Sequence, residues 1–391
     1  MFNLHKPYIS GTDYKSIESS IKSGWVSSAG PMIKKFEQII SKFTRSKHVI
    51  ACSTGTSALH ISLKIMNFNK NEEIIVPSLT FIASVNSIIY NNLSPFFFDN
   101  NNYYTIDEIN LLKYLTTNTK RVKKYNKYYL LNKKTLKIIR AIMLVHTFGN
   151  AVDIEKIYNF CKKNNIIIIE DAAESLGTFY KKGKFKNYHT GTVGLVGCLS
   201  FNGNKIVTTG SGGAILTNDN ILAKRARYFI NQSKNDRLFY IHNEVGYNYR
   251  MNNLQASFGC SQFNKLKKIL KLKKKIHNIY KKNFNDENLN ISSTPEFCIS
   301  NNWLNILQIK KKLNKNKLTE LILELEKKGI ETRPLWYPNH KQKPFKKYEH
   351  HNINFLNKIY YNRLCLPSSP DLTINDIKYI SKQIKTLLSK I

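Results

Sequence analysis

Short apolar runs bounded by turn-forming residues recur through the first two-thirds of the chain. Most of these runs are continuous, which is typical of strands that are buried on both faces of a sheet. Seven of them predict strands: His48–Ser53, Glu73–Pro77, Pro95–Asp99, Arg140–His146, Ile166–Asp171, Val196–Phe201 and Gly213–Thr217. Segments with helical spacing lie between several of them, at Ser57–Met66, Ala83–Asn91 and Ile154–Asn164. This alternation predicts an α/β fold in which helices cover both faces of a mostly parallel sheet.

The last third of the chain has a different pattern. A long stretch with helical spacing runs from Asn252 to about Asn283, and a polar, loop-like segment follows over residues 285–302. An apolar run at Trp303–Ile309 precedes two further helical patterns, at Leu318–Lys328 and Ile374–Leu388. These elements predict a second, smaller α/β unit at the C-terminal end.

One segment interrupts the alternation of strands and helices in the first part of the chain. Residues Lys120–Lys137 are basic and rich in tyrosine, and an Asn-Lys-Lys-Thr turn lies inside them. We interpret this segment, at about residues 115–140, as a hairpin inserted at the surface. The expected organisation is a large domain over residues 1–262 that carries the hairpin, followed over residues 263–391 by a linking helix and a small C-terminal domain.

Composition agrees with a folded chain of one large or two ordinary domains. The 391 residues are 42% hydrophobic and 22% charged, which is enough to bury a sizeable core. A net charge of +35 favours, at first sight, a nucleic-acid or membrane-surface partner. The basic residues are spread along the chain, however, and the densest run, Lys265–Lys282, has apolar residues at helical spacing. That run predicts an amphipathic helix with a solvated lysine face, and we expect neither a nucleic-acid nor a membrane partner.

The cysteines and the first residues bear on metal binding and on the cellular compartment. The six cysteines include no Cys-x-x-Cys pair, so the sequence predicts no zinc site and no other metal. A disulfide framework is not expected in a chain of this length, which favours a reducing compartment. Residues 1–20 contain no apolar segment of the secretory kind, and no apolar run approaches the length of a bilayer span. We therefore expect a cytoplasmic protein.

The residues that follow the strands are the first candidates for ligand binding, because open parallel sheets bind ligands at the carboxyl ends of their strands. After the first strand, Gly55, Thr56 and Ser57 lead directly into a helix. Free backbone N–H groups at a helix start favour a phosphate. Serine and threonine are also common helix caps, so this segment alone is compatible with a phosphate site and with simple capping.

Charged residues also lie at the end of the fifth predicted strand and after the sixth. The fifth strand ends at Glu170 and Asp171, and a carboxylate there needs a cationic partner, such as the protonated ring nitrogen of a cofactor. The alternative is that Asp171 caps a following helix. After the sixth strand, Lys205 lies between an apolar run and a glycine-rich turn at residues 210–213, where a buried lysine is a candidate for Schiff-base chemistry. This order of phosphate site, carboxylate and lysine resembles that of pyridoxal-phosphate enzymes of the aspartate-aminotransferase type.

The chain also resembles the DegT/DnrJ/StrS family of sugar aminotransferases over nearly its whole length. The motifs that carry the resemblance are Gly24–Ser28, Gly55–His60, Pro77–Phe81, Glu170–Ser175, Ser200–Lys205, Gly246–Met251 and Arg333–Pro338. The resemblance implies the type I fold of pyridoxal-phosphate enzymes, with a mostly parallel seven-stranded sheet and a smaller C-terminal α/β domain. Within the family, the chain is most similar to the branch that aminates C4 of UDP-4-keto-6-deoxy-N-acetylglucosamine on the way to bacillosamine and legionaminic acid. The segments that favour this branch are Asn202–Lys205, Lys120–Lys137 and Arg333–Trp336.

The resemblance implies roles for individual residues around pyridoxal phosphate. Lys205 would hold the cofactor as an internal aldimine and shuttle a proton, and Asp171 would keep the ring nitrogen protonated. Phe81 would stack on the ring, although its sequence context alone favours core packing, and Glu174 would contact the 3-hydroxyl. The implied contacts to the cofactor phosphate come from Gly55, Thr56, Ser57 and Ser200, and from Asn248 of the partner subunit in a homodimer with shared sites.

The implied reaction is a ping-pong amino transfer. L-Glutamate gives up its amino group and leaves as 2-oxoglutarate, and the nucleotide-sugar ketone accepts the group at C4. Arg333, Trp336 and His340 would line the sugar-nucleotide site; equally, Trp336 could pack the small domain and Arg333 could form a structural ion pair. Alternatives with the same fold act on a GDP-linked sugar of the perosamine type, a dTDP-sugar or a C3 ketone. A separate alternative is a non-catalytic basic binding protein on the same scaffold.

Overall fold

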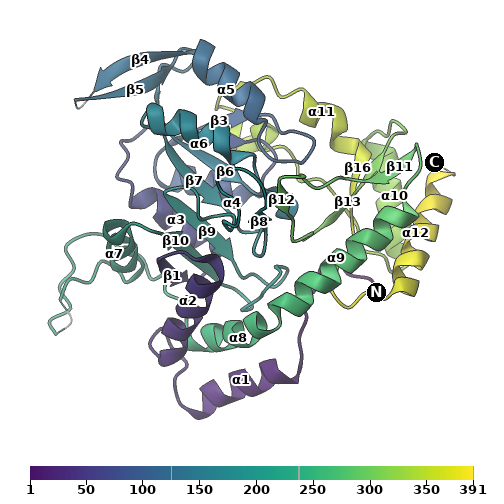
Figure 1. Ribbon diagram of the computed structural model, residues 1–391, viewed down its shortest axis with the longest axis horizontal. Helices are drawn as coiled ribbons and strands as arrows, with labels where there is room; N and C mark the ends of the chain where they lie inside the picture. Colours follow the sequence, from purple (N-terminus) through teal and green to yellow (C-terminus); the bar gives the residue numbers. More distant parts are fainter. Residues whose placement is uncertain (125, 237, 391) are drawn as a thin grey trace.

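The computed structural model describes residues 1–124, 126–236 and 238–390 and is built around one mixed sheet of ten strands (Figure 1). Neighbouring strands from β9 to β15 are parallel, whereas β10 is antiparallel to both of its neighbours. The predicted α/β sheet of mostly parallel strands is confirmed, and all seven predicted strands belong to it. The main path across the sheet is β1 (His48–Cys52), β10 (Gly213–Thr217), β9 (Val196–Ser200), β7 (Ile167–Asp171), β6 (Ile138–Val145), β2 (Glu73–Pro77), β3 (Ser94–Phe98) and β15 (His350–His351).

The sheet has ten strands, where seven were expected, because three more strands join it. The hairpin of β4 (Thr119–Lys124) and β5 (Lys127–Asn132) pairs with β6 through β5, and β15 extends the edge of β3. The hairpin therefore widens the main sheet. The Asn-Lys-Lys-Thr turn, expected inside the hairpin, instead connects β5 to β6. Tyr125, within the predicted insertion at about 115–140, lies outside the described residues.

Helices cover both faces of the main sheet, as the sequence pattern predicts. One face packs against α5 (Glu108–Thr117) and α6 (Ile154–Lys163). Strands such as β2 and β3 are buried at every position, which explains their unbroken apolar sequences. The other face is covered by α2 (Pro31–Thr44), α3 (Gly55–Lys64), α4 (Ile82–Tyr90), α7 (Asn220–Ile230) and α8 (Asn253–Asn264).

Two consecutive helices lead from the main sheet to a smaller one. The sequence pattern predicts one continuous helix here, but the structure has α8 and α9 (Leu266–Asn283), with a break at Lys265. At this break the Lys265 side chain forms an ion pair with the buried Asp13 of α1 (Gly11–Lys22). The predicted domain boundary after residue 262 falls in the last turn of α8.

The smaller sheet is antiparallel and has a core of its own. Its order is β11 (Leu289–Ile291), β13 (Asn305–Ile309), β16 (Arg363–Leu366) and β14 (Arg333–Pro334). α10 (Lys315–Lys327), α12 (Ile374–Leu388) and α9 pack around this core. The segment that was expected to be a loop, residues 285–302, contains β11 and β12 (Cys298–Ile299).

The two parts of the chain exchange segments. Phe2, at the start of the chain, pairs with Ile330 of the smaller unit, and β12 pairs with β8 (Phe179–Tyr180). The strand β15 crosses in the other direction, to the edge of the main sheet. The division into residues 1–262 and 263–391 stays a prediction, and Ile391 lies outside the described residues. No helix in the described ranges is long and apolar enough to span a bilayer.

One lysine of α9 contradicts the predicted solvated lysine face. Lys273 is fully buried, and its Nζ donates hydrogen bonds to the carbonyl oxygens of Trp303 (2.6 Å) and Ser368. Burial lowers the pKa of Lys273 well below its usual value, because the charged form loses its hydration. Lys273 lies four residues after Ile269 and three before Ile276, so helical spacing places it on the apolar face of α9.

Candidate active site

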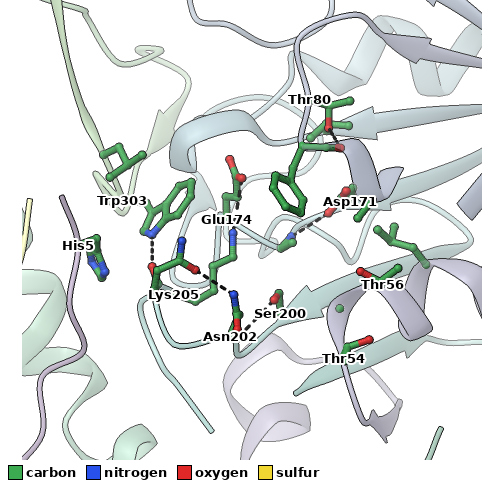
Figure 2. A pocket seen from close by; sticks show the side chains of 18 of the residues that line it. His5, Thr54, Thr56, Thr80, Asp171, Glu174, Ser200, Asn202, Lys205 and Trp303 are labelled. Carbon is green, nitrogen blue, oxygen red and sulfur yellow. Dashed lines mark hydrogen bonds and ion pairs between the residues drawn. The ribbon is translucent and has the colours of Figure 1, made fainter. Parts of the chain in front are cut away.

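A pocket of about 440 Å³ lies at the carboxyl ends of the central strands (Figure 2). Asp171 ends β7 and Ser200 ends β9. β1 runs in the same direction as β9, since each is antiparallel to β10, and it leads into the start of α3 at the same edge. His5 and Trp303 line the side away from Asp171 (Figure 2). The pocket therefore lies where the main sheet meets the smaller unit, and polar groups from three strand ends converge on it.

The N-terminus of α3 offers an anion site in this pocket. Thr54 Oγ1 accepts a hydrogen bond from the N–H of Ser57 (2.9 Å), and Ser57 Oγ accepts one from the N–H of Thr54 (3.0 Å). The N–H groups of Gly55 and Thr56 donate to no acceptor within the described part of the chain. Thr54 and Ser57 thus cap the helix, while two donors at its positive end stay available for a phosphate. The predicted phosphate contact of Ser57 stays a prediction, since its hydroxyl already takes part in the cap.

Gly55 allows α3 to approach β9 closely. A Cβ atom at position 55 would lie 2.8 Å from Cβ of Ser200 and 3.0 Å from its Oγ. The Ser200 hydroxyl therefore lies beside the start of the helix, on the wall of the same pocket. The helix N–H groups and this hydroxyl can reach one phosphate together.

Gly55→Ala is expected to weaken the binding of pyridoxal phosphate by about 1–3 kcal/mol, because the added methyl group must push α3 away from β9. A spectroscopic titration of the cofactor-free protein measures the Kd. Gly203→Ala is the matched control at the same pocket edge, since a Cβ there would meet no atom closer than 3.9 Å. Equal affinities for the two variants would contradict the packing argument.

Asp171 is a buried carboxylate on the wall of the pocket. Its Oδ2 accepts a hydrogen bond from Oγ of Ser84 (2.6 Å), and its Oδ1 accepts one from the N–H of Ala173 (3.1 Å). Burial raises the pKa of Asp171, while these hydrogen bonds and the charge of Lys205 act in the opposite direction. Turns follow β7, so the alternative in which Asp171 caps a helix is wrong. Among the described residues it forms no ion pair, and a cationic ligand would supply the missing partner.

Lys205 lies between an aromatic ring and a second carboxylate. Its Nζ is 3.5 Å from Oε1 of Glu174 and 4.0 Å from the ring centroid of Trp303, and 13% of its side chain is exposed. Glu174 Oε2 accepts a hydrogen bond from the N–H of Phe148 (2.8 Å). Burial raises the pKa of Glu174 to about 7, against the opposing charge of Lys205. A largely buried amine beside a group that titrates near neutrality suits attack on a carbonyl and proton transfer.

Two aromatic residues of the predicted set line the pocket. Phe81 is 54% exposed at the start of α4, so the alternative in which it packs in the core is wrong. Its ring centroid lies 6.0 Å from that of Trp336. Trp336 also packs on Phe148, with 4.8 Å between the centroids. Trp336 therefore lines the pocket and packs on residues of the main-sheet part of the chain, and its contact with substrate stays a prediction.

Arg333 and Asn248 do not line the pocket of their own chain. The Nη2 of Arg333 pairs with Oε1 of Glu331 at 2.9 Å, which confirms the structural ion pair that the sequence allowed. Glu331 itself lines the pocket, so Arg333 lies one residue away from the wall. Asn248 is exposed in the segment after α7. The contacts of Arg333 with substrate, and of Asn248 with a partner subunit, stay predictions.

His340 also lies outside the pocket wall. Its Nδ1 is 2.6 Å from Oγ of Ser78, in the loop that precedes Phe81. Burial, with the nearby His350 and Lys341, lowers the pKa of His340 to about 4, so its ring is neutral near pH 7. A direct contact of His340 with substrate stays a prediction.

The structure brings in residues that the sequence analysis did not single out. Ser84, which hydrogen-bonds to Asp171, lies inside a helical pattern that gives no sign of this role. His5 lines the pocket, and both of its ring nitrogens are buried without a hydrogen-bond partner among the described residues. Trp303 begins the apolar run at Trp303–Ile309, and a tryptophan at that point was the only sequence signal for it.

These groups fit pyridoxal phosphate, which carries a phosphate, a ring nitrogen that can be protonated and an aldehyde. The free N–H groups of Gly55 and Thr56 suit the phosphate. The Asp171 carboxylate, which has no cationic partner in the described chain, suits the ring nitrogen, and the Lys205 amine suits the aldehyde. Within the described ranges no group of three or more His, Cys, Asp or Glu side chains could hold a metal ion.

Comparison with known proteins gives relatives along the whole chain. GDP-perosamine synthase of Escherichia coli O157:H7 is 32% identical over 387 residues, which cover 99% of this chain and 98% of the relative. The putative pyridoxal phosphate-dependent aminotransferase EpsN of Bacillus subtilis is 30% identical over 376 residues, covering 95% and 91%. The structure of Helicobacter pylori PseC, an aminotransferase involved in the biosynthesis of pseudoaminic acid, aligns over 100% of both chains with a TM-score of 0.86 at 21% identity.

The fold and the site define a pyridoxal-phosphate-dependent nucleotide-sugar aminotransferase. More narrowly, the chain belongs to the DegT/DnrJ/EryC1/StrS aminotransferase family, whose sequence profile matches residues 7–385. Pyridoxal phosphate is its cofactor, and the family implies a nucleotide-sugar substrate. The alternative of a non-catalytic basic binding protein is therefore set aside.

Proposed function

We propose that this enzyme transfers the amino group of L-glutamate to the C4 ketone of a nucleotide-linked 4-keto-6-deoxy sugar. The observation that carries the proposal is the convergence in one pocket of Lys205, the Asp171 carboxylate and the free N–H groups at the start of α3. L-Glutamate as donor and C4 as the acceptor position come from the family branch that the sequence motifs resemble.

Each residue of the pocket has a task in this proposal. When bound, pyridoxal phosphate draws electrons away from the carbon that carries the transferred amino group. Asp171 holds a proton at the ring nitrogen, and its burial strengthens that ion pair. Lys205 takes up and returns a proton at Nζ, beside Glu174, which we place at the cofactor's 3-hydroxyl. Phe81 covers the ring and excludes water from one face.

The contacts to the cofactor phosphate have to hold the cofactor even when it is not bonded to Lys205. While Lys205 is free to move a proton, contacts to the phosphate and the ring alone would hold the cofactor. We assign the phosphate to the N–H groups of Gly55 and Thr56 and to the hydroxyls of Ser57 and Ser200. The donor-rich start of α3 is fixed by its own cap, so this anchor is in place before the cofactor arrives.

We place the nucleotide sugar against the smaller unit. The diphosphate would take the position of Glu331 as the partner of Arg333, because a guanidinium pairs well with phosphate oxygens. Trp336 would pack against the sugar or the base. His340, through its hydrogen bond to Ser78, would support the loop that carries Phe81.

The proposal includes a homodimer with shared sites. Asn248 is exposed and does not line the pocket of its own chain. A residue that contacts the cofactor phosphate of a second subunit must have both of these properties. The segment before it exposes several large apolar side chains, which a second copy of the chain would cover. These are Leu238, Phe239, Tyr240, Ile241 and Val245.

Two nucleotide sugars are candidates for the acceptor. The segments Asn202–Lys205, Lys120–Lys137 and Arg333–Trp336 support UDP-4-keto-6-deoxy-N-acetylglucosamine, whose amination leads towards bacillosamine and legionaminic acid. The 32% identity to GDP-perosamine synthase over almost the whole chain supports a GDP-linked keto-sugar instead. We take the UDP-linked sugar as the first candidate and the GDP-linked sugar as the second.

The enzyme, supplied with L-glutamate, is expected to aminate the UDP-linked sugar with a kcat/KM at least about tenfold above that for a GDP-linked 4-keto-6-deoxy sugar, a difference of about 1.4 kcal/mol in transition-state binding. NMR of the isolated products locates the new amine, and Lys205→Ala serves as the blank. A preference for the GDP-linked sugar would establish the second candidate. Amination at C3, or of neither sugar, would overturn the proposed acceptor.

A further inference from the structure

Trp303 contacts both Lys205 and Asn204, the residue that precedes Lys205 in the chain (Figure 2). The ring centroid of Trp303 lies 4.0 Å from Nζ of Lys205, and the indole N–H donates a hydrogen bond to the carbonyl oxygen of Asn204 at 2.7 Å. The carbonyl oxygen of Trp303 accepts a hydrogen bond from the buried Nζ of Lys273 at 2.6 Å. One buried side chain therefore holds the backbone just before the lysine and also faces the end of the lysine side chain.

The orientation of Trp303 is fixed from the cofactor side of the pocket. Its backbone N–H donates to Oδ1 of Asn301 at 2.9 Å, and Nδ2 of Asn301 donates to the carbonyl oxygen of Glu174 at 2.8 Å. Gly149 makes room for this link, because a Cβ atom there would lie only 1.9 Å from Oδ1 of Asn301. Trp303 and Glu174 thus belong to one hydrogen-bonded unit, and Nζ of Lys205 lies in contact with both.

The charged and titratable groups around Lys205 show which interaction the indole ring of Trp303 can add. Glu174 and Asp171 are the acids that interact with its charge. Burial, with Lys273 and Lys205 nearby, lowers the pKa of His5 well below its usual value, so this neighbour is a neutral ring near pH 7. A cation placed over an indole face and shielded from water is attracted by the negative face of the ring.

We propose that Trp303 is a positioning residue that binds the ammonium form of Lys205 whenever this lysine is not bonded to the cofactor. The inference rests on the role of Lys205 under the proposed function. In that role the lone pair of the freed Nζ would form a new N–H bond as the C–H bond of the bound donor breaks. The electron pair of that C–H bond would pass to the electron-withdrawing cofactor until the proton is returned to carbon. A ring face that stabilises the ammonium favours the uptake of this proton and keeps Nζ in the pocket.

Two variants separate the ring face from the indole hydrogen bond. Trp303→Leu removes both, whereas Trp303→Phe loses the N–H and the fused five-membered ring but keeps a smaller aromatic face, which makes it the matched control. The measurement uses cofactor-free protein: pyridoxal phosphate is added at a series of pH values, and the rate at which the visible absorption band returns is recorded. This reaction needs the uncharged amine and no catalytic turnover. We expect the pH midpoint of the rate to fall by about one unit in Trp303→Leu, a tenfold change in proton affinity, and to stay near the wild-type midpoint in Trp303→Phe.

A Trp303→Leu protein that is folded by circular dichroism and has an unchanged midpoint would overturn the proposal. Equal shifts in the Leu and Phe variants would overturn it as well, since the effect would then belong to the hydrogen bond with Asn204. If Trp303→Leu does not fold, Trp303→Met, with a large flexible side chain and no ring, takes its place with the same expected shift. A wild-type protein that forms no band would instead refute the role of Lys205, whatever the Trp303 variants do.

Discussion

Lys205→Ala is expected to abolish the visible absorption band of the lysine-bound cofactor and to lower kcat by about 10⁴-fold or more. Lys205 is the only lysine among the described residues that line the pocket, so no other amine there can take over the bond to the aldehyde. Absorption spectra before and after the addition of L-glutamate test the bond, and turnover with a nucleotide keto-sugar tests the loss of activity.

Two controls separate the chemistry of Lys205 from its charge and from general damage. Lys205→Arg keeps a positive charge beside Glu174 but has no amine that attacks an aldehyde at neutral pH, so it is expected to lack the band as well. Lys186→Ala removes an exposed lysine and should leave the band and the activity unchanged. A Lys205→Ala protein that still shows the band and converts L-glutamate would exclude the assignment.

Asp171→Asn is expected to lower kcat by about 10²–10³-fold while leaving the cofactor-free protein at least as stable as wild type at pH 7. Asparagine keeps the shape of the side chain and can still accept the hydrogen bond from Ser84, but it removes the charge that would hold the ring nitrogen protonated. The loss is therefore electrostatic, and it appears in both half-reactions.

The expected gain in stability depends on pH in a definite direction. Burial raises the pKa of Asp171 above its value in the unfolded chain. The charged carboxylate therefore destabilises the folded state at pH values above the folded pKa, and this cost disappears below the unfolded pKa. Urea unfolding of cofactor-free wild type and Asp171→Asn should show a difference at pH 7 that closes as the pH falls towards about 4.

Asp219→Asn is the matched control for this substitution. Asp219 accepts hydrogen bonds at the start of α7, and asparagine caps helices equally well, so activity and stability should both be unchanged. An Asp171→Asn enzyme with wild-type activity would show that this carboxylate is not the partner of the ring nitrogen. A cofactor-free variant that is less stable than wild type at pH 7 would show that the buried charge is not a cost to the fold.

The main sheet could be predicted because its strands are buried on both faces. β2 and β10 coincide with the predicted segments, since burial at every position leaves an unbroken apolar run that ends at a turn. The break between α8 and α9 could not be predicted in this way. It lies at Lys265, whose ionic partner Asp13 is 252 residues away in the sequence, so no local pattern records the contact.

The burial of Lys273 could have been predicted from its helical spacing, but the lysine-rich composition of α9 suggested a solvated side chain instead. Its spacing from Ile269 and Ile276 places it among the apolar positions of α9, yet a helix so rich in lysine was interpreted as having one solvated charged face. The structure buries this amine against two carbonyl oxygens of distant loops. Helical spacing, applied residue by residue, would have identified it.

The residues of the candidate site also differ in whether a local sequence pattern could identify them. Gly55, Asp171 and Lys205 could be identified because each lies at or after the end of a strand, at the ligand edge of the sheet. Ser84 and Trp303 could not, because their roles depend on contacts with Asp171 and Asn204, which are 87 and 99 residues away from them. A side chain that acts only through another residue leaves no motif of its own in a single sequence.

The pairing of the first residues with the last part of the chain has a consequence for synthesis on the ribosome. The N–H of Leu4 donates to Oε2 of Glu331, and the N–H of Lys6 donates to Oγ of Ser369, partners that are 327 and 363 residues further on. Leu4 and Lys6 therefore reach these bonds only after more than 300 later residues have been synthesised. Leu4 and His5 line the pocket, so a nascent chain that already has the whole main cofactor-binding edge still lacks this wall. This wall of the pocket can form only after residues 331–369 have been synthesised.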